Sequence, residues 1–401
     1  MAALELADVF RRHGDAYRRD HAGHLGRVER RVMSAVELCR TAALGGHVEA
    51  CGDCGATRVA YNSCRNRHCP KCQAAARDDW LAARQAELLP VPYFHVVFTL
   101  PPGAAAIAFQ NKAVVYALLM RCAAEAIMTL AANPRRLGAE TGLLAVLHTW
   151  GQTLTHHPHV HCVVPGGGLT PDGQGWIGCR PAFFLPVKPL GRLFRRLFLA
   201  GLETAFRRGQ LEAFGDLACL EEPRRFAEHI ATLRRMEWLV YAKPPFDGPE
   251  RVLAYLARYT HRTAIANSRL VAVEADHVAF SYKDYRHHGR HEVMRLAPGE
   301  FIRRFLLHVL PDGFHRIRHY GLLANGHRAE KLDRCRAAIV RQARAESAGA
   351  AVETGALDPP PRAPGKNEGG EARLCPHCGG VMRRIGEIPP TTPDRYRWDT
   401  S

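Results

Sequence analysis

Two histidines separated by a single valine stand in the stretch "THHPHVHCVVPGGG", Thr155–Gly168. Side chains alternate between the two faces of a strand, so a strand here would place His159 and His161 on one face. Two imidazoles on one face can chelate a divalent cation, although the same pair could also be polar side chains on a solvated sheet. The run Gly166–Gly168 permits a tight exit from the strand, where a ligand could come close.

Two tyrosines form a second pair, in "YLARYTHR". Tyr255 and Tyr259 are four residues apart, so on a helix they share one face. Arg258 and Arg262 add positive charge beside them. The alternative is that both tyrosines pack a helix onto a sheet.

Four cysteines in "CGDCGATRVAYNSCRNRHCPKC" have the spacing of a zinc ribbon. Two Cys-x2-Cys knuckles can present four thiolates to one tetrahedral ion, and such a closed site is structural rather than catalytic. We therefore expect structural Zn²⁺ at Cys51, Cys54, Cys69 and Cys72. Cys64 and His68 are spare donors beside this site. A second knuckle, "CPHC" at Cys375–Cys378, has no partner pair after it, so the sequence assigns it no metal.

The charge of the chain favours a polyanionic partner. Its 401 residues contain 55 Lys+Arg against 39 Asp+Glu, a net charge of +16, and nucleic acid is the commonest partner of such proteins. The segments "RLFRRLF" and "HRIRHYG" suit contact with a phosphate backbone, or else are solvated faces of amphipathic elements. The same two interpretations hold for four basic residues of the cysteine module, namely Arg58, Arg65, Arg67 and Lys71.

The composition also bears on the compartment. No window looks long and apolar enough to span a bilayer, and the N-terminus lacks the apolar core of a signal peptide. We expect a cytoplasmic bacterial protein, associated with the nucleoid when it acts, in which 13 cysteines serve metal binding rather than disulfides. No membrane and no small-molecule cofactor is expected as a partner.

Strands and helices mix without a strict βαβ alternation, which indicates an α+β fold. "YFHVVFTLP" (93–101), 143–155 and "HVHCVVPGG" read as strands, and about 107–130 and much of 188–240 as helices. We divide the chain into a helical and zinc-ribbon domain (1–90), a catalytic domain (91–325), a helical end with a flexible linker (326–374) and a C-terminal tail (375–401).

Taken together, these features fit cleavage of a DNA strand by a tyrosine nucleophile. A phenol with a pKa of about 10 is a poor nucleophile at neutral pH unless the phosphate is made more electrophilic. A cation held by two histidines would do this by binding non-bridging phosphate oxygens. Attack would leave a phosphotyrosine and a free hydroxyl, which conserves the bond energy for rejoining.

The histidine stretch "HPHVHCVVPGGG" resembles the His-hydrophobic-His motif of the HUH single-strand endonucleases. Further stretches resemble the rolling-circle transposases of the insertion-sequence 91 family, of the two-tyrosine type, in the order in which that family has them. They cover most of residues 38–324 and are "CRTAALGGHVEACGDCG", "RHCPKCQ", "FTLP", "HTWGQTLTHHPHVH", "YLARYTHRTAIANSRL" and "EFIRRFLLHVLPDGFHRIRHYGLLA".

The resemblance implies an HUH fold, with a central antiparallel sheet that carries the histidines and a helix that presents the tyrosines. It implies His159 and His161 as metal ligands and Tyr255 and Tyr259 as nucleophiles. The family also has a third, polar ligand, for which our candidates are His148 and Gln152 on the preceding strand-like run. It further implies Mg²⁺ or Mn²⁺ as catalytic cofactor, a 5′-phosphotyrosine intermediate, and single-stranded transposon ends and target DNA as partners.

Three other functions remain open at this point. A rolling-circle replication initiator would share the chemistry and differ only in its DNA. A non-enzymatic zinc-ribbon regulator would have no use for the histidine and tyrosine pairs. A metallohydrolase that activates water at His159 and His161 would release a free 5′-phosphate instead of a protein adduct.

Overall fold

The computed structural model describes residues 3–85, 87–243, 263–285, 287, 289–348 and 373–391. Their contacts divide the chain into two compact units, one within Met1–Asp79, His261–Val309 and Gly355–Ser401, the other within Trp80–Thr260 and Leu310–Thr354. The units are interleaved, whereas the segments expected from the sequence were consecutive. Interleaving arises because strand β13 (Met382–Ile388) pairs with β1 (Gly46–Cys51), and helix α9 (Pro298–Leu306) packs against α1 (Leu6–Asp20).

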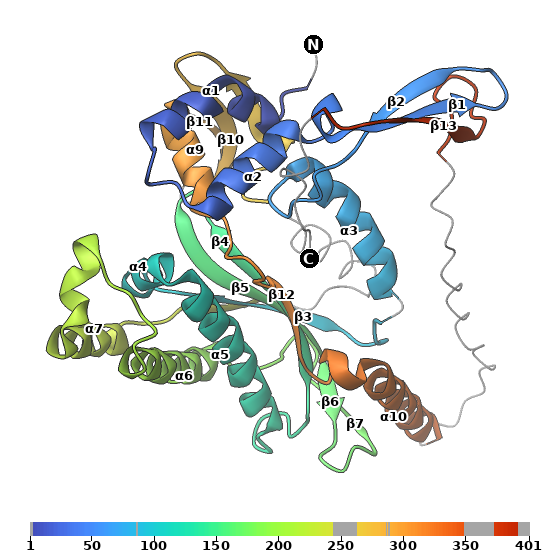
Figure 1. Ribbon diagram of the computed structural model, residues 1–401. Helices are drawn as coiled ribbons and strands as arrows, with labels where there is room; N and C mark the ends of the chain where they lie inside the picture. Colours follow the sequence, from blue (N-terminus) through green and yellow to red (C-terminus); the bar gives the residue numbers. More distant parts are fainter. Residues whose placement is uncertain are drawn as a thin grey trace. The chain divides into compact units, whose positions relative to one another are not determined.

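The second unit is built on a five-stranded antiparallel sheet in the order β12-β4-β5-β3-β8 (Figure 1). The strands are β3 (Tyr93–Thr99), β4 (Gly142–Trp150), β5 (His156–Pro165), β8 (Val240–Lys243) and β12 (Ile317–Gly321). The expectation of an α+β fold around a central antiparallel sheet is confirmed.

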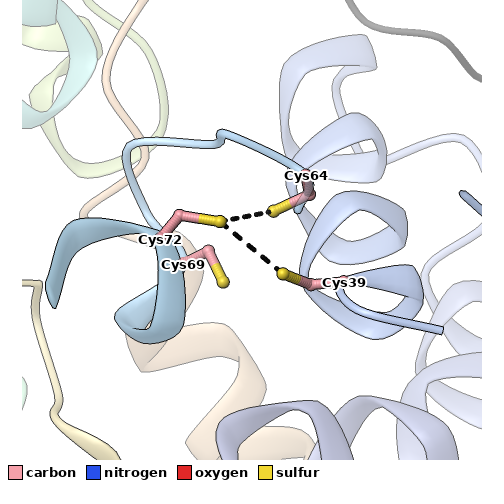
Figure 2. A group of neighbouring side chains, drawn as sticks. All are labelled: Cys39, Cys64, Cys69 and Cys72. Carbon is pink, nitrogen blue, oxygen red and sulfur yellow. Dashed lines mark hydrogen bonds between the residues drawn. The ribbon is translucent and has the colours of Figure 1, made fainter. Parts of the chain in front are cut away.

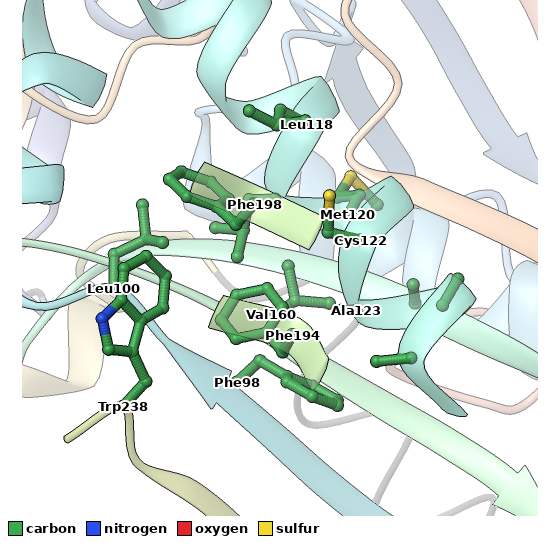
Figure 3. Packing of buried hydrophobic residues seen from close by; sticks show 14 of the residues in the cluster. Phe98, Leu100, Leu118, Met120, Cys122, Ala123, Val160, Phe194, Phe198 and Trp238 are labelled. Atoms are coloured by element: carbon green, nitrogen blue, oxygen red, sulfur yellow. The ribbon is translucent and has the colours of Figure 1, made fainter. Parts of the chain in front are cut away.

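One face of this sheet is apolar and covered by helices. The helices are α4 (Pro102–Gln110), α5 (Lys112–Ala132), α6 (Val187–Arg207) and α7 (Pro223–Arg235), with the 3-10 turn η2 (Gly215–Glu221) between the last two. Phe98 and Val160 from the strands meet Phe194, Phe198 and Trp238 in the main core of this unit (Figure 3). Since odd and even residues point to opposite faces, this packing leaves His159 and His161 on the other face.

Helix α5 corrects one expectation from the sequence. Among the described residues it is the one helix long and apolar enough to cross a membrane by length and composition, with a mean hydropathy of 1.6. Its buried residues, such as Tyr116, Leu119 and Ala123, belong to the core against the sheet. Helix α5 is thus apolar because it is buried in the core on more than one side.

The three glycines Gly166–Gly168 lie close to the backbone of other segments of the same chain, whereas the sequence suggested close approach of a ligand there. A Cβ at Gly166 would lie 2.9 Å from the carbonyl oxygen of Pro92, and one at Gly168 would collide with the backbone of Glu140. They lead into the small sheet β6 (Gly167–Leu169) and β7 (Trp176–Gly178), which contacts α10 (Arg328–Ala348). The turn η4 (Asn325–His327) precedes α10.

The first unit contains two three-stranded sheets. Strands β9 (Leu270–Val273), β10 (Val278–Asp284) and β11 (Arg290–Leu296) form one, preceded by the turn η3 (Asn267–Arg269). Helix α1 packs on α2 (Arg27–Leu38) and α9, with Phe10 edge-on to Phe305. The other sheet has the order β13-β1-β2, with β2 at Thr57–Tyr61. In the chain, the turn η1 (Ala42–Leu44) precedes β1, and helix α3 (Pro70–Gln85) follows β2.

Candidate active site and cysteine clusters

Three histidines gather on the sheet face opposite the main core. His148 of β4 lies directly across from His159 of β5, and His161 follows on the same face. One ring nitrogen of each lies within 4.8 Å of those of the other two. His148 and His161 are buried, and His159 is half-buried. The structure thus brings the two histidines of the motif together with one of the two residues considered for a third ligand.

Hydrogen bonds orient these rings. The Nδ1 atom of His159 lies 2.7 Å from the carbonyl oxygen of His157. Because a carbonyl only accepts, Nδ1 carries the proton and Nε2 keeps a lone pair for a cation. The Nδ1 atom of His161 lies 2.8 Å from Nε2 of His95, and when His161 donates there, its own buried Nε2 keeps the lone pair.

His95 is a residue that the sequence analysis missed. It stands on β3, is 2% exposed, and stacks on His161 with ring centroids 5.0 Å apart. Burial, with Lys243 and His159 nearby, lowers the pKa of His95 to about 3, so its ring is neutral at pH 7 and offers one accepting nitrogen. The feature of the sequence that could have indicated a role for His95 is its place as the one histidine in the apolar strand "YFHVVF".

The chemistry of this donor set suits a divalent cation. Imidazole nitrogens bind first-row transition ions well, whereas Mg²⁺ prefers oxygen ligands. Three imidazoles on one face would leave positions for water or for phosphate oxygens. Mn²⁺ is therefore a better match to these side chains than Mg²⁺, which would depend on oxygens from water or substrate.

Tyr255, Tyr259, Arg258 and Arg262 lie outside the described residues, which stop after Lys243 at the end of β8 and resume at residue 263. Gln152 lies in the turn between β4 and β5, half-buried.

The cysteines form two clusters of four, not the single site expected from their spacing. Cys69 and Cys72 gather with Cys39 and Cys64, and Cys51 and Cys54 gather with Cys375 and Cys378. The predicted grouping of Cys51, Cys54, Cys69 and Cys72 is therefore wrong. The C-terminal knuckle, to which the sequence assigned no metal because no pair follows it, lies beside a pair from earlier in the chain. The spacing in the sequence is misleading here because β1, which ends at Cys51, pairs with β13 as well as with β2. The pairing with β13 places the C-terminal knuckle, Cys375 and Cys378, beside Cys51 and Cys54.

Each member of the first cluster points its sulfur toward the other three (Figure 2). The Sγ of Cys72 lies 3.6 Å from that of Cys39 and 3.5 Å from that of Cys64. These distances exceed a disulfide bond of about 2.05 Å and approach the edge of about 3.8 Å that a tetrahedron with Zn–S of about 2.3 Å requires. Hydrogen bonds from Cys64 and Cys69 lower the pKa of Cys39 to about 7, and bonds from Cys39 and Cys64 lower the pKa of Cys72. The same contacts raise the pKa of Cys64 and of Cys69, so two of the four sulfurs act as thiol donors to the other two.

The four basic residues of this module have different surroundings. Arg58 pairs with the buried Glu49, and Lys71 pairs with Glu5, so both charges are compensated within the protein. Arg65 is exposed, and burial lowers the pKa of the half-buried Arg67. Of the four, Arg65 is thus the most accessible to a phosphate.

Comparison with known proteins identifies the family. Residues 142–331 match the family described as "Putative transposase", and residues 9–100 match the "Transposase zinc-binding domain". The chain is 57% identical over 99% of its length, and 98% of the relative's, to "Putative transposase y4qJ" of Sinorhizobium fredii. This chain belongs to the transposases of the insertion-sequence 91 family.

A second relative is more distant. The chain is 28% identical, over 76% of its length and 72% of the relative's, to the "Transposase for insertion sequence element IS801" of Pseudomonas savastanoi pv. phaseolicola. No solved structure matches the chain. The transposase is thus an enzyme of DNA cleavage with a zinc-binding domain, as the resemblance in its sequence indicated. The histidine cluster lies within the first matched range, and the whole first cysteine cluster lies within the second.

Proposed function

We propose that the transposase cleaves single-stranded DNA at the ends of its element through a 5′-phosphotyrosine formed on Tyr255 or Tyr259. The observation that carries the proposal is the cluster of His148, His159 and His161 on a sheet face opposite the core, in which the Nδ1 hydrogen bond of His159 leaves the lone pair on its Nε2. A bound Mn²⁺ or Mg²⁺ there would supply charge to the non-bridging oxygens of the scissile phosphate.

The side chains then divide the work. The histidines would hold the cation that supplies positive charge beside the phosphate, and the phenol oxygen of one tyrosine attacks phosphorus after losing its proton to solvent. The bond from phosphorus to the 3′-oxygen breaks, and that oxygen leaves as a 3′-hydroxyl after taking up a proton. Tyrosine remains joined to the 5′-phosphate, so the later attack of a 3′-hydroxyl restores a phosphodiester without ATP.

Two tyrosines can hold two strand ends in succession, as strand transfer of the rolling-circle type requires. The first would accept the end released at one terminus of the element, and the second would accept the end of the target or of the other terminus. A replication initiator would share this chemistry, and the family of the chain favours transposition over it. Acting on DNA, the protein would work at the nucleoid in the cytoplasm.

A basic groove in the second unit suits the DNA backbone. It has a volume of about 680 Å³ and lies along α6, with Arg192, Arg195 and Arg196 joined by Arg234 of α7. Arg195 donates to the carbonyl oxygen of Met236 and Arg234 pairs with Glu203, whereas Arg192 and Arg196 are exposed one turn apart. Such a row of guanidinium groups is typical of phosphate contact.

The test uses labelled single strands from the flanks of the element with purified protein and Mn²⁺. The expected result is a covalent DNA adduct on a denaturing gel, lost in His161→Ala and kept in Tyr285→Phe, a control at an exposed tyrosine of the other unit. A free 5′-phosphate without an adduct would show water as the nucleophile. Full adduct formation by His161→Ala would refute the role of the histidines.

A further inference from the structure

The second cysteine cluster joins the two ends of the chain. Cys51 and Cys54 stand at the end of β1 and in the turn after it, and Cys375 and Cys378 stand just before β13. The family model of the zinc-binding domain covers residues 9–100 and so includes only the first pair. The match to the family model therefore leaves out the two cysteines, Cys375 and Cys378, that complete this cluster.

The two knuckles have the same backbone structure. In the first, the N–H of Cys51 donates to the carbonyl of Ala56 (2.9 Å) and that of Gly55 to Cys51 (3.1 Å). In the second, the N–H of Cys375 donates to Gly380 (2.7 Å) and that of Gly379 to Cys375 (2.9 Å). Gly55 and Gly379, each directly after the second cysteine, have φ of 71° and 76°, which glycine adopts without strain. Two matching turns thus present two thiols each.

The sulfurs face one another across the knuckles. Sγ of Cys51 lies 3.5 Å from that of Cys378, and Sγ of Cys54 lies 3.6 Å from that of Cys375. These separations are too long for a disulfide and close to the tetrahedral edge of about 3.8 Å for zinc thiolates. A Cβ at Gly380 would lie 3.0 Å from Sγ of Cys51, so the close approach of the knuckles leaves little room for a side chain there.

Two further interactions hold the C-terminal segment in this place. Strand β13 pairs antiparallel with β1 from Gly46 opposite Ile388 to Cys51 opposite Met382. Arg373 lies 3.4 Å from the buried carboxylate of Glu49, on the same strand β1.

We propose that Cys51, Cys54, Cys375 and Cys378 bind a second structural Zn²⁺, which fastens residues 373–391 to the N-terminal sheet. The transposase then carries two zinc ions per chain, and its C-terminal segment is a part of the zinc-binding module. A metal clip across more than 300 residues of chain removes conformational freedom from the unfolded state, and the paired strand stops β1 from being an open edge.

Alkylation of the full-length protein tests this proposal with an internal control. Cys54, Cys378 and Cys219 are all exposed, and Cys219 belongs to neither cluster. An iodoacetamide time course read by mass spectrometry is expected to show Cys219 modified rapidly and Cys54 and Cys378 protected, until a strong zinc chelator makes all three reactive. Equal rates at the three thiols before chelation would overturn the proposal.

Zinc content gives the second measurement. Wild-type protein and Cys219→Ser are expected to hold two zinc ions per chain, and the double variant Cys375→Ser, Cys378→Ser to hold one, with faster amide exchange over β13. One zinc ion in the wild type, or two in a double variant, would overturn the proposal whatever the stability of the variant. Catalysis enters neither measurement, so failure here leaves the proposed DNA cleavage standing.

Discussion

Replacing His95 by phenylalanine removes one hydrogen bond behind the histidine cluster and keeps an aromatic ring in a buried place. The bond joins Nε2 of His95 to Nδ1 of His161 over 2.8 Å, and the two residues are 2% and 8% exposed. Without it, the ring of His161 loses a hydrogen bond that helps to hold its tautomer and orientation. We expect the affinity for Mn²⁺ to fall in consequence, with the fold intact.

The size of this effect follows from the kind of contact. Loss of a partner that orients a histidine ligand typically weakens metal binding by about 10- to 100-fold, roughly 1.4–2.7 kcal/mol. His319→Phe is the matched control, because His319 of β12 lies opposite Leu144 of β4, on the same face of the sheet and outside the cluster.

The assay is a titration of zinc-loaded protein with Mn²⁺, with free Mn²⁺ read by electron paramagnetic resonance. Wild type and His319→Phe should bind alike, and His95→Phe more weakly by the factor given. If His95→Phe is folded and binds Mn²⁺ as tightly as wild type, the hydrogen bond does not position His161. An equal loss in His319→Phe would show a general effect of the substitution on the sheet.

Three further predictions concern stability and DNA binding. Phe98→Ala should destabilise the second unit by about 3–5 kcal/mol in urea unfolding, because Phe98 is fully buried and packs edge-on to Phe194; an unchanged midpoint would contradict the described core. Hydrogen bonds from Arg303 hold the pKa of Glu300 at about 2, below its ordinary 4.5, so the stabilisation it gives is present above pH 4.5 and lost toward pH 2. Glu300→Gln should therefore be less stable than wild type at pH 6, with a difference that shrinks below pH 4.5; a constant difference would refute the assignment. Changing Arg192 and Arg196 to Gln should reduce the slope of log affinity for single-stranded DNA against log salt by about 1.4, or 0.7 for each lost phosphate contact, and an unaltered slope would exclude α6 from the interface.

The sequence predicted the strands that carry the histidines better than the pairing of distant parts. The motif around His159 and His161 follows from strand alternation alone. The structure places His148, one of the two candidates for a third ligand, beside them because β4 pairs with β5 in the matching register. His95 was missed because the sequence of one apolar strand does not show which residues of the neighbouring strand its histidine will contact, here His161 of β5.

The cysteines show the opposite case. Equal Cys-x2-Cys spacing cannot tell which knuckles share an ion, since that depends on a strand pairing between residues 46–51 and 382–388. Cys39 lies apart from any knuckle and its role appears only when α2 ends beside Cys64 and Cys72. The local Cys-x2-Cys patterns thus predicted a zinc-binding protein. Which four cysteines come together depends on the pairing of strands that are distant in the sequence.

The central claim is most directly tested by locating the DNA on the protein. After reaction of the wild type with single-stranded element ends and Mn²⁺, trypsin separates the two tyrosines, since cleavage after Arg251, Arg258 and Arg262 yields VLAYLAR and YTHR. Our account predicts that a nucleotide remains attached through its 5′-phosphate to one or both of these peptides, and to no other. A DNA-linked peptide elsewhere in the chain, or an adduct that persists in the double variant Tyr255→Phe, Tyr259→Phe, would contradict it.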